Sequence, residues 1–482
     1  MNIVDCEPKS VFKLFRQISD IPREAQNETQ ICNFLIDFAI SHGLDYYRDD
    51  SNNIIIRKPA SIGYEDFPTV ILQAHMDMVC VKREGSNHNF LSDPIDIIVD
   101  GDIIKAKDTT LGADNGIGLA VALAIIDENI PSPSLEIVVT SSEEIGLVGA
   151  QALDKSKING SVLINLDNSN FGELCVGSAG PLRMESSIPI EFEDNNGDAQ
   201  FHLKISGLLS GHSGDVIDRE RANAIILLGR ILNELKKNFD LFLFDISGGS
   251  KMNLIPNIAQ MDFSVKKENV DKLNDLIFEM QNLFSKEFAA SEKNINISLQ
   301  PIEVENKKCI SQKTLEKLIS CILLMPNGVI NMSVDMKDLP NTSNNLGVLE
   351  INDKNIVFYS MVRSMTSSRK YFVADKIKLL FTDGKVNILT DIPAWDYDPD
   401  SKLNDILVSI YKNLFGETAQ VKAIHGGLEC NCFAGRVKYL VSIGADIFAL
   451  HTVNEYCSIK SVQNLWKFVC QILQNENLKN LS

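Results

Sequence analysis

The sequence predicts an α/β protein in which a mostly parallel sheet is flanked by helices and interrupted by an inserted α+β domain. Three observations support this prediction. Strand and helix patterns alternate from the N-terminus to about Gly180. Beyond Gly180 the strands become more amphipathic, and after about residue 391 the first pattern returns. Alternation of strand and helix indicates βαβ units, and therefore parallel strands covered by helices on both faces.

The first part of the predicted α/β domain covers residues 1–181. Apolar residues recur at helical spacing in residues 10–21 and 29–43. The strand candidates are apolar runs at residues 69–75, 134–144 and 161–168. Residues 115–129 lie between the first two strand candidates, are apolar on most faces, and are long enough for a buried helix.

Residues 182–390 form the predicted inserted domain, with two similar α+β halves. A strand, a long helix and a strand follow one another in residues 259–300, and the same order recurs in residues 357–391. Helical patterns at residues 402–416 and 461–475 flank a strand candidate at 439–445. We therefore expect residues 391–482 to complete the first domain.

Composition narrows the classes of partner. The 482 residues carry a formal net charge of −18, with 44% hydrophobic and 23% charged residues. An acidic balance of this kind argues against nucleic acid or an anionic membrane as partner. The N-terminus has no basic start followed by an apolar core, and the ten cysteines are sparse and irregularly spaced. We expect a cytoplasmic protein with reduced thiols.

Each of the three strand candidates in the first part ends in ionisable residues. Ligands of an open α/β sheet bind in the crevice beyond the carboxyl ends of its strands, so these side chains should meet there. Asp114 precedes the buried helix and should face the same crevice, and a second imidazole, His451, follows an apolar stretch near the C-terminus. The residues at the ends of the three strands are His75 and Asp77, Glu143 and Glu144, and Asp167.

Carboxylates gathered between apolar walls need positive charge, and few Lys or Arg residues lie in these segments. A pair of divalent metal ions meets that need most simply. Zinc binds imidazole nitrogen and carboxylate oxygen, and two ions ~3.5–4 Å apart can share a ligand.

The spacing of these residues suggests distinct roles. His75 and Asp77 lie two residues apart, so Asp77 could bond the outer nitrogen of His75 and fix its tautomer. Glu143 and Glu144 are neighbours and should point differently, so one can bind metal while the other serves as a general base. Taken singly, each residue has an ordinary structural interpretation, such as an N-cap or a solvated loop. Their conjunction at strand ends favours a site.

Seven motifs in this order resemble the aminoacyl-histidine dipeptidases, a branch of the two-zinc exopeptidases that include aminoacylases and carboxypeptidases. The resemblance runs from about residue 5 to 475, and the motifs are AHMDMV, TTLGADNGIG, TSSEEIGLVGA, LINLDN, GHSGDVI, HGGLEC and LHTVNEYCSI. It implies two divalent ions, zinc first, with manganese or cobalt as alternatives. It also implies a cis peptide between Asp114 and Asn115.

The resemblance implies a role for each matching residue of the metal site. His75 and Asp167 would hold one ion and Glu144 and His451 the other. Asp114 would bridge them. Glu143 would be the general base and acid, with Asp77 orienting His75.

The inserted domain resembles the lid of that family. His212 would polarise the scissile carbonyl or stabilise its oxyanion. Arg363 and Asn253 are candidates for binding the carboxylate end of a dipeptide substrate. Glu429, with His425, could hold the free amino group. An exposed strand edge on the lid could support a homodimer.

Several positions depart from the family pattern. Asp108 stands where a glycine usually precedes TTLGADNG, and Asp218 where a histidine usually follows GHSG and isoleucine. The usual PHSPDE is replaced by LHTVNE around His451, and losing the prolines could loosen that loop. Two alternatives to a dipeptidase therefore stay open: an N-acyl amino acid amidohydrolase on the same site, and a non-catalytic relative that binds peptide or metal.

Overall fold

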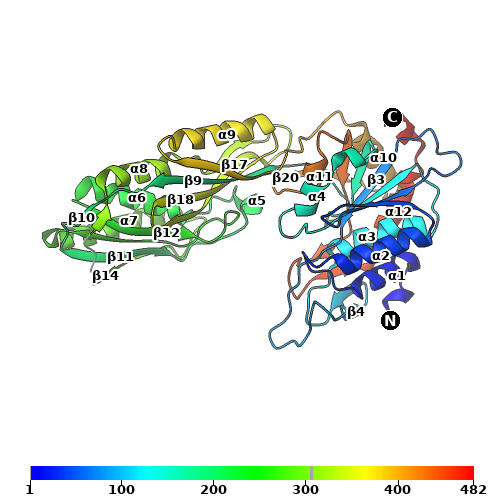
Figure 1. Ribbon diagram of the computed structural model, residues 1–482, viewed down its shortest axis with the longest axis horizontal. Helices are drawn as coiled ribbons and strands as arrows, with labels where there is room; N and C mark the ends of the chain where they lie inside the picture. The colour runs from blue at the N-terminus through cyan, green and yellow to red at the C-terminus, as the bar shows by residue number, and fades with distance from the viewer. Residues whose placement is uncertain (1, 304–307, 482) are drawn as a thin grey trace. The chain divides into compact units, whose positions relative to one another are not determined.

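The computed structural model describes residues 2–303 and 308–481, and the chain folds into two compact units (Figure 1). Unit 1 contains Met1–Gly177, Tyr397–Ala423 and Leu428–Ser482. Unit 2 contains Ser178–Asp396 and Ile424–Gly427. The short return segment 424–427 belongs to unit 2 because the Ala179 amide donates a hydrogen bond to the carbonyl of Ile424 at 3.1 Å.

An eight-stranded sheet forms the centre of unit 1, in the order β1-β2-β6-β3-β7-β21-β8-β20. Its strands are β1 (Asp45–Arg48), β2 (Ile54–Lys58), β3 (Val70–His75), β6 (Leu135–Thr140), β7 (Val162–Asn165), β8 (Glu173–Ser178), β20 (Gln420–Ile424) and β21 (Tyr439–Ser442). β6, β3, β7 and β21 are parallel, whereas β2 and β8 join them antiparallel. The sheet is therefore mixed, with its parallel strands at the centre.

Helices cover this central sheet, and the most apolar of them is fully buried. Helix α3 packs against β3 and against α1, so almost all of its residues lack solvent exposure. The helices are α1 (Lys9–Ser19), α2 (Thr29–Ser41), α3 (Ala113–Asp127), α4 (Val148–Ala152), α10 (Lys402–Phe415), α11 (Cys430–Phe433) and α12 (Ile459–Leu473). Every strand and helix expected in this part of the sequence is present.

A small sheet in the order β22-β23-β5-β4 also belongs to unit 1. Its strands are β4 (Ile97–Asp100), β5 (Ile103–Ala106), β22 (Ile447–Phe448) and β23 (Tyr456–Ser458). The loop between β22 and β23 carries His451, so pairing of β23 with β5 anchors this C-terminal segment.

Unit 2 is built on a nine-stranded sheet in the order β14-β11-β13-β12-β17-β18-β9-β19, with β16 also paired to β17. Its strands are β9 (Gly180–Pro189), β11 (Ala199–Ser206), β12 (Phe242–Gly249), β13 (Ala259–Val265), β14 (Asn296–Pro301), β16 (Gly328–Met332), β17 (Pro340–Ile351), β18 (Asn355–Ser364) and β19 (Lys385–Asp391). Apolar side chains from one face, such as Leu203 and Phe358, join a core with the four long helices. Those helices are α6 (Ala224–Asn238), α7 (Val270–Glu287), α8 (Gln312–Leu324) and α9 (Ser367–Leu380).

Strand order within this sheet is mirrored about the junction of β12 with β17. Moving outward from the junction, one side runs β12, β13, β11, β14 and the other runs β17, β18, β9, β19. Helix α7 connects β13 to β14, and α9 connects β18 to β19. The two stretches with strand, helix and strand therefore occupy matching places. A separate pair, β10 (Phe192–Asp194) and β15 (Lys308–Ile310), lies outside this sheet.

Two further observations concern the whole described chain. Within residues 2–303 and 308–481, no disulfide joins any of the ten cysteines. Among the described residues, no helix is both long and apolar enough to cross a membrane.

Candidate metal centre of unit 1 and a polar cluster of unit 2

Three neighbouring parallel strands of unit 1 end at one edge of the sheet. In register, His75 at the end of β3 lies beside Thr140 at the end of β6, and Gln73 lies beside Asn165 at the end of β7. The chain after β6 and β7 then places further acidic side chains at that edge. This is the convergence that the strand patterns predict.

Asp114 lies between the two imidazoles, with one carboxylate oxygen toward each. Its Oδ1 lies 3.0 Å from Nε2 of His75, and its Oδ2 lies 3.2 Å from Nε2 of His451. The peptide bond between Asp114 and Asn115 is cis, as the resemblance implies. A carboxylate presented to two imidazoles in this way has the geometry of a bridging ligand.

The other two acidic side chains sort to opposite sides of Asp114. Asp167 Oδ1 lies 3.4 Å from Nε2 of His75, whereas Glu144 Oε2 lies 3.2 Å from Nε2 of His451. Ligand atoms of His75, Asp114 and Glu144 all lie within 4.8 Å of one another. The five side chains expected to bind metal therefore lie together, as two sets that share Asp114.

Asp77 is fully buried and orders two segments at once. Its carboxylate accepts hydrogen bonds from the backbone amides of Glu143 at 3.0 Å and Glu144 at 3.1 Å. The outer nitrogen of His75, Nδ1, lies 3.2 Å from the Asp77 carbonyl oxygen and 3.5 Å from its carboxylate. The imidazole therefore faces both the carbonyl and the carboxylate of Asp77, and the carboxylate also holds the Glu143–Glu144 turn.

The carboxylates of this cluster raise the pKa of both imidazoles. Hydrogen bonds to Asp114 and Glu144 raise the pKa of His451 to about 10. Burial lowers the pKa of His75, but the carboxylates of Asp167 and Asp114 outweigh it and raise that pKa well above the usual value. Burial raises the pKa of Asp167 to about 8. A cluster that holds protons so strongly supplies the ligands and the negative charge that divalent cations require.

The side chains fit two metal ions of a kind that binds both nitrogen and oxygen ligands. Each side offers one imidazole, one terminal carboxylate and a share of Asp114, which suits zinc. Glu144 Oε1 is buried, and no described residue donates a hydrogen bond to it. An unbonded carboxylate oxygen in this position favours a cation as its partner.

Glu143 stands beside the cluster without joining it. Burial raises the pKa of its carboxyl group well above the usual value, and the charges of Asp167 and Glu429 act in the same direction. A carboxyl group with a raised pKa next to a metal site is suited to accept and return a proton.

Glu429 is a second buried carboxylate of unit 1. Its Oε2 accepts hydrogen bonds from Gln73 Nε2 at 2.5 Å and from Thr140 Oγ1 at 2.8 Å. Its Oε1 is buried and has no hydrogen-bond donor among the described residues. One oxygen is therefore fixed while the other stays free for a donor such as an amine.

A polar cluster of unit 2 joins Arg363 of the sheet to the turn that carries His212 and Asp215. Arg363, on β18, donates from Nη2 to Nε2 of His212 at 3.2 Å, and Nδ1 of His212 lies 3.3 Å from Asp215. Burial lowers the pKa of Arg363 to about 10. Arg363 is only 4% exposed, and no described residue accepts a hydrogen bond from its Nε. Its guanidinium therefore retains capacity for an anion.

His425 belongs to this second cluster. Its Nε2 lies 2.7 Å from Oγ of Ser343, which is the cross-strand neighbour of Arg363. Burial, and then the charge of Arg363, lower the pKa of His425 to about 3, so the imidazole is neutral. His425 lies in unit 2 and Glu429 in unit 1, so their joint action on one amino group stays a prediction.

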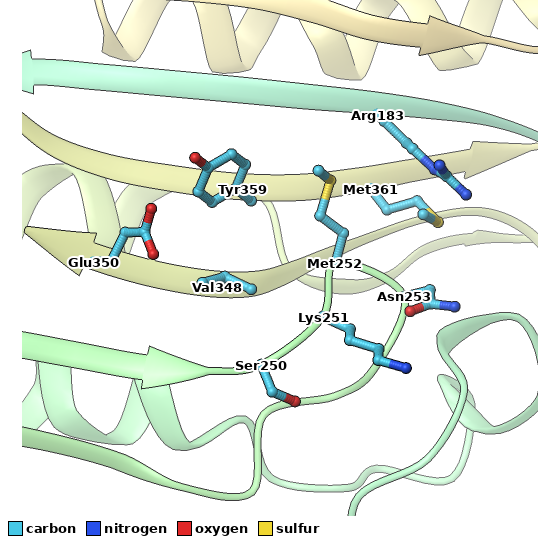
Figure 2. A pocket seen from close by; sticks show the side chains of 9 residues that line it. All are labelled: Arg183, Ser250, Lys251, Met252, Asn253, Val348, Glu350, Tyr359 and Met361. Carbon is cyan, nitrogen blue, oxygen red and sulfur yellow. The ribbon is translucent and has the colours of Figure 1, made fainter. Parts of the chain in front are cut away.

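Asn253 lines an open pocket of about 460 Å³ on the sheet face opposite the helices of unit 2 (Figure 2). The view shows Arg183 and Lys251 near Asn253, with Glu350 and Tyr359 toward the other end. The Asn253 carbonyl accepts a hydrogen bond from the amide of Ser213 at 2.8 Å, which places the pocket next to the His212 turn.

Sequence reasoning missed the residues that hold these groups in place. Gln73, Thr140, Ser343 and Asp215 each contact one of the expected site residues. Gln73 carried a usable signal, because it interrupts an apolar strand. Ser343 carried none, because strand pairing alone brings it to His425.

Comparison with known proteins agrees with this geometry. The model of Peptidase family M20/M25/M40 matches residues 71–475. The cytosol non-specific dipeptidase of Escherichia coli K12 is 35% identical over 97% of each chain. The crystal structure of aminoacylhistidine dipeptidase from Vibrio alginolyticus has a TM-score of 0.89 with 31% identity and covers 98% of each chain. A tripeptidase from Staphylococcus aureus, at 17% identity and a TM-score of 0.55, shares the fold. The chain belongs to the M20/M25/M40 family of peptidases.

Proposed function

We propose that this peptidase hydrolyses dipeptides with the help of two divalent metal ions. One observation carries the proposal: Asp114 presents one oxygen to each of two imidazoles, and each imidazole has its own further carboxylate. The dipeptidases of E. coli and V. alginolyticus, which align over nearly the whole chain, support the substrate class. Substrates would include dipeptides with a C-terminal histidine.

The ligands would be His75 and Asp167 on one side, Glu144 and His451 on the other, and Asp114 between them. Zinc suits this donor set, with manganese and cobalt as alternatives. When bound, the ions would polarise the scissile carbonyl and make water more acidic.

Glu143 transfers the proton in this proposal. Its carboxylate takes the proton of the attacking water and returns it to the nitrogen of the leaving amine. Burial keeps the pKa of Glu143 high, which suits a group that must both accept and release a proton. Asp77 holds the backbone amide of Glu143 and so fixes the start of its side chain.

Recognition of both charged ends would limit the substrate to two residues. Arg363 can pair with the C-terminal carboxylate, since its buried guanidinium has unused donors. Asn253 lies near the same cluster. Glu429, with one oxygen unbonded, can accept from the N-terminal ammonium. His212 would then stabilise the oxyanion once a substrate carboxylate draws Arg363 away from it.

Three broader expectations accompany this function. We propose that the second unit acts as a lid, that the protein works in the cytoplasm, and that the lid edge can support a homodimer. The cytosolic dipeptidase of E. coli supports the second of these.

Metal analysis coupled to a substrate panel tests the proposal. Purified protein should hold two divalent ions per chain and hydrolyse dipeptides faster than N-acetyl amino acids. Faster hydrolysis of N-acetyl amino acids would favour an amidohydrolase. Metal binding without any turnover on either substrate class would favour a binding protein.

A further inference from the structure

Two buried charged residues, Arg23 and Glu455, lie next to the metal-binding segments but supply none of the expected ligands. Arg23 is 2% exposed and Glu455 is 3% exposed. Burial lowers the pKa of Arg23, and the charge of Glu455 is the largest of those that oppose this shift. Buried charges are costly unless their hydrogen bonds are satisfied, so the contacts of these two side chains indicate their role.

Glu455 binds the backbone that leads into Asp114. Its Oε2 accepts hydrogen bonds from the amides of Leu111 at 2.9 Å and Gly112 at 3.0 Å. Its Oε1 accepts from Ala113 at 2.8 Å and from Asp114 itself at 3.4 Å. These amides open α3, where backbone donors lack partners within the helix and favour a negative charge. One side chain thus fixes the backbone of the bridging ligand.

The same residue belongs to the segment of the second imidazole. Glu455 follows His451 by four positions, and its amide donates to the carbonyl of Thr452 at 3.1 Å. His451 has φ +62°, a left-handed conformation that L-residues rarely adopt without support. This loop reads LHTVNE and lacks prolines that would stiffen it. The four hydrogen bonds of Glu455 therefore tie the His451 loop to the Asp114 segment.

Arg23 ties the third segment to the other two. Its Nη1 donates to the carbonyls of Met76 at 3.0 Å and Asp77 at 2.9 Å, directly after His75. Its Nη2 donates to the carbonyl of Gly112 at 2.5 Å. A side chain at Gly112 would come within 2.5 Å of the guanidinium, and Gly112 has φ +68°, so only glycine allows this approach.

We propose that Arg23 and Glu455 are positioning residues that set the spacing of His75, Asp114 and His451 for two metal ions. They act through backbone groups on three segments that are far apart in the sequence. The inference rests on the proposed function, because it gives this pair a purpose only if the cluster binds metal. Loss of such an outer contact typically weakens metal affinity about 10–100-fold.

Glu136 offers a matched control. It is also buried, its carboxylate accepts the amides of Asn159 at 2.9 Å and Gly160 at 3.0 Å, and it pairs with Arg57 at 3.3 Å. It lies near the start of β6, whereas Glu143 and Glu144 follow the end of that strand. Glu136→Gln should destabilise the fold without changing the metal site.

The test measures zinc and cobalt affinity by chelator competition for the wild type, Glu455→Gln and Glu136→Gln, with thermal unfolding of each metal-free protein. Glu455→Gln should lose about 10–100-fold in affinity for at least one of two ions, while Glu136→Gln stays within about twofold of the wild type. Cobalt absorption should change in Glu455→Gln alone. If Glu455→Gln fails to fold, Arg23→Lys should show the same loss of affinity, because a lysine cannot span both segments.

Two contrary outcomes are distinguishable. Wild-type affinity in a folded Glu455→Gln protein, or an equal loss in Glu136→Gln, would overturn the positioning role alone. A wild-type chain that binds no divalent ion would overturn the proposed function together with this inference.

Discussion

The polar clusters of the two units have opposite electrostatic character. In unit 1, carboxylates outnumber imidazoles, and buried oxygens of Glu144 and Glu429 have no donor among the described residues. In unit 2, Arg363 contacts His212 and lies near Arg183. The Nε of Arg363 has no hydrogen-bond acceptor among the described residues. The first cluster therefore needs cations and the second needs an anion. In the proposed function, the cations are the metal ions with the amino end of the substrate, and the anion is its carboxylate end.

Removing metal should have the largest effect on activity, and it tests the need of the unit 1 cluster for cations. Dialysis against a chelator should abolish hydrolysis, because the bound ions would polarise the scissile carbonyl and make water more acidic. Adding zinc, manganese or cobalt back should restore it, and should raise the unfolding temperature since the ions bind only the folded chain. Full activity in protein shown by elemental analysis to be metal-free would refute this.

The Glu143→Gln substitution should have the second-largest effect, with kcat reduced about 10²–10⁴-fold because the proposed general base is lost. Metal content should stay at the wild-type value, since Glu143 is not among the expected ligands. Glu144→Gln serves as the contrast and should lose metal as well as turnover. Steady-state kinetics and elemental analysis of both variants would separate the two roles.

The Arg363→Lys substitution tests whether the polar cluster of unit 2 binds the carboxylate of a substrate. The loss of a paired, charge-assisted contact should raise KM for dipeptides about 10–100-fold. Dipeptides with a C-terminal amide should bind weakly to the wild type and be little affected by the substitution. Arg230→Lys is a suitable control, since Arg230 pairs with Glu287 at the surface at 2.7 Å. Equal effects of the two substitutions would remove Arg363 from substrate binding.

The smallest effect should be the pH dependence of stability in the metal-free protein. The pKa of His451 is raised to about 10 and that of Asp167 to about 8, so the folded chain holds protons that the unfolded chain releases. The stability from His451 is present below pH 6.5 and is lost as pH rises through 10. That from Asp167 is lost between about pH 4 and 8. The unfolding temperature of the metal-free protein should therefore fall as the pH rises, and it should fall less when metal is bound.

Periodicity and strand-end reasoning predicted the parallel strands β3, β6 and β7 and the gathering of acidic groups beyond them. This succeeded because consecutive parallel strands must end at one edge of the sheet. The contact of His212 with Arg363 depends on pairing across a long sheet, which local patterns do not encode. The roles of Arg23 and Glu455 could not be predicted from the sequence, because both side chains bind backbone amides and carbonyls. Every residue has such groups, so no residue pattern indicates which of them will be bound.

The most direct test of the account is the anomalous scattering of a zinc-loaded crystal. Two peaks should flank Asp114, one bound by His75 and Asp167 and the other by His451 and Glu144. A single peak that leaves Asp114 uncoordinated, or metal bound elsewhere with this cluster empty, would contradict the central claim.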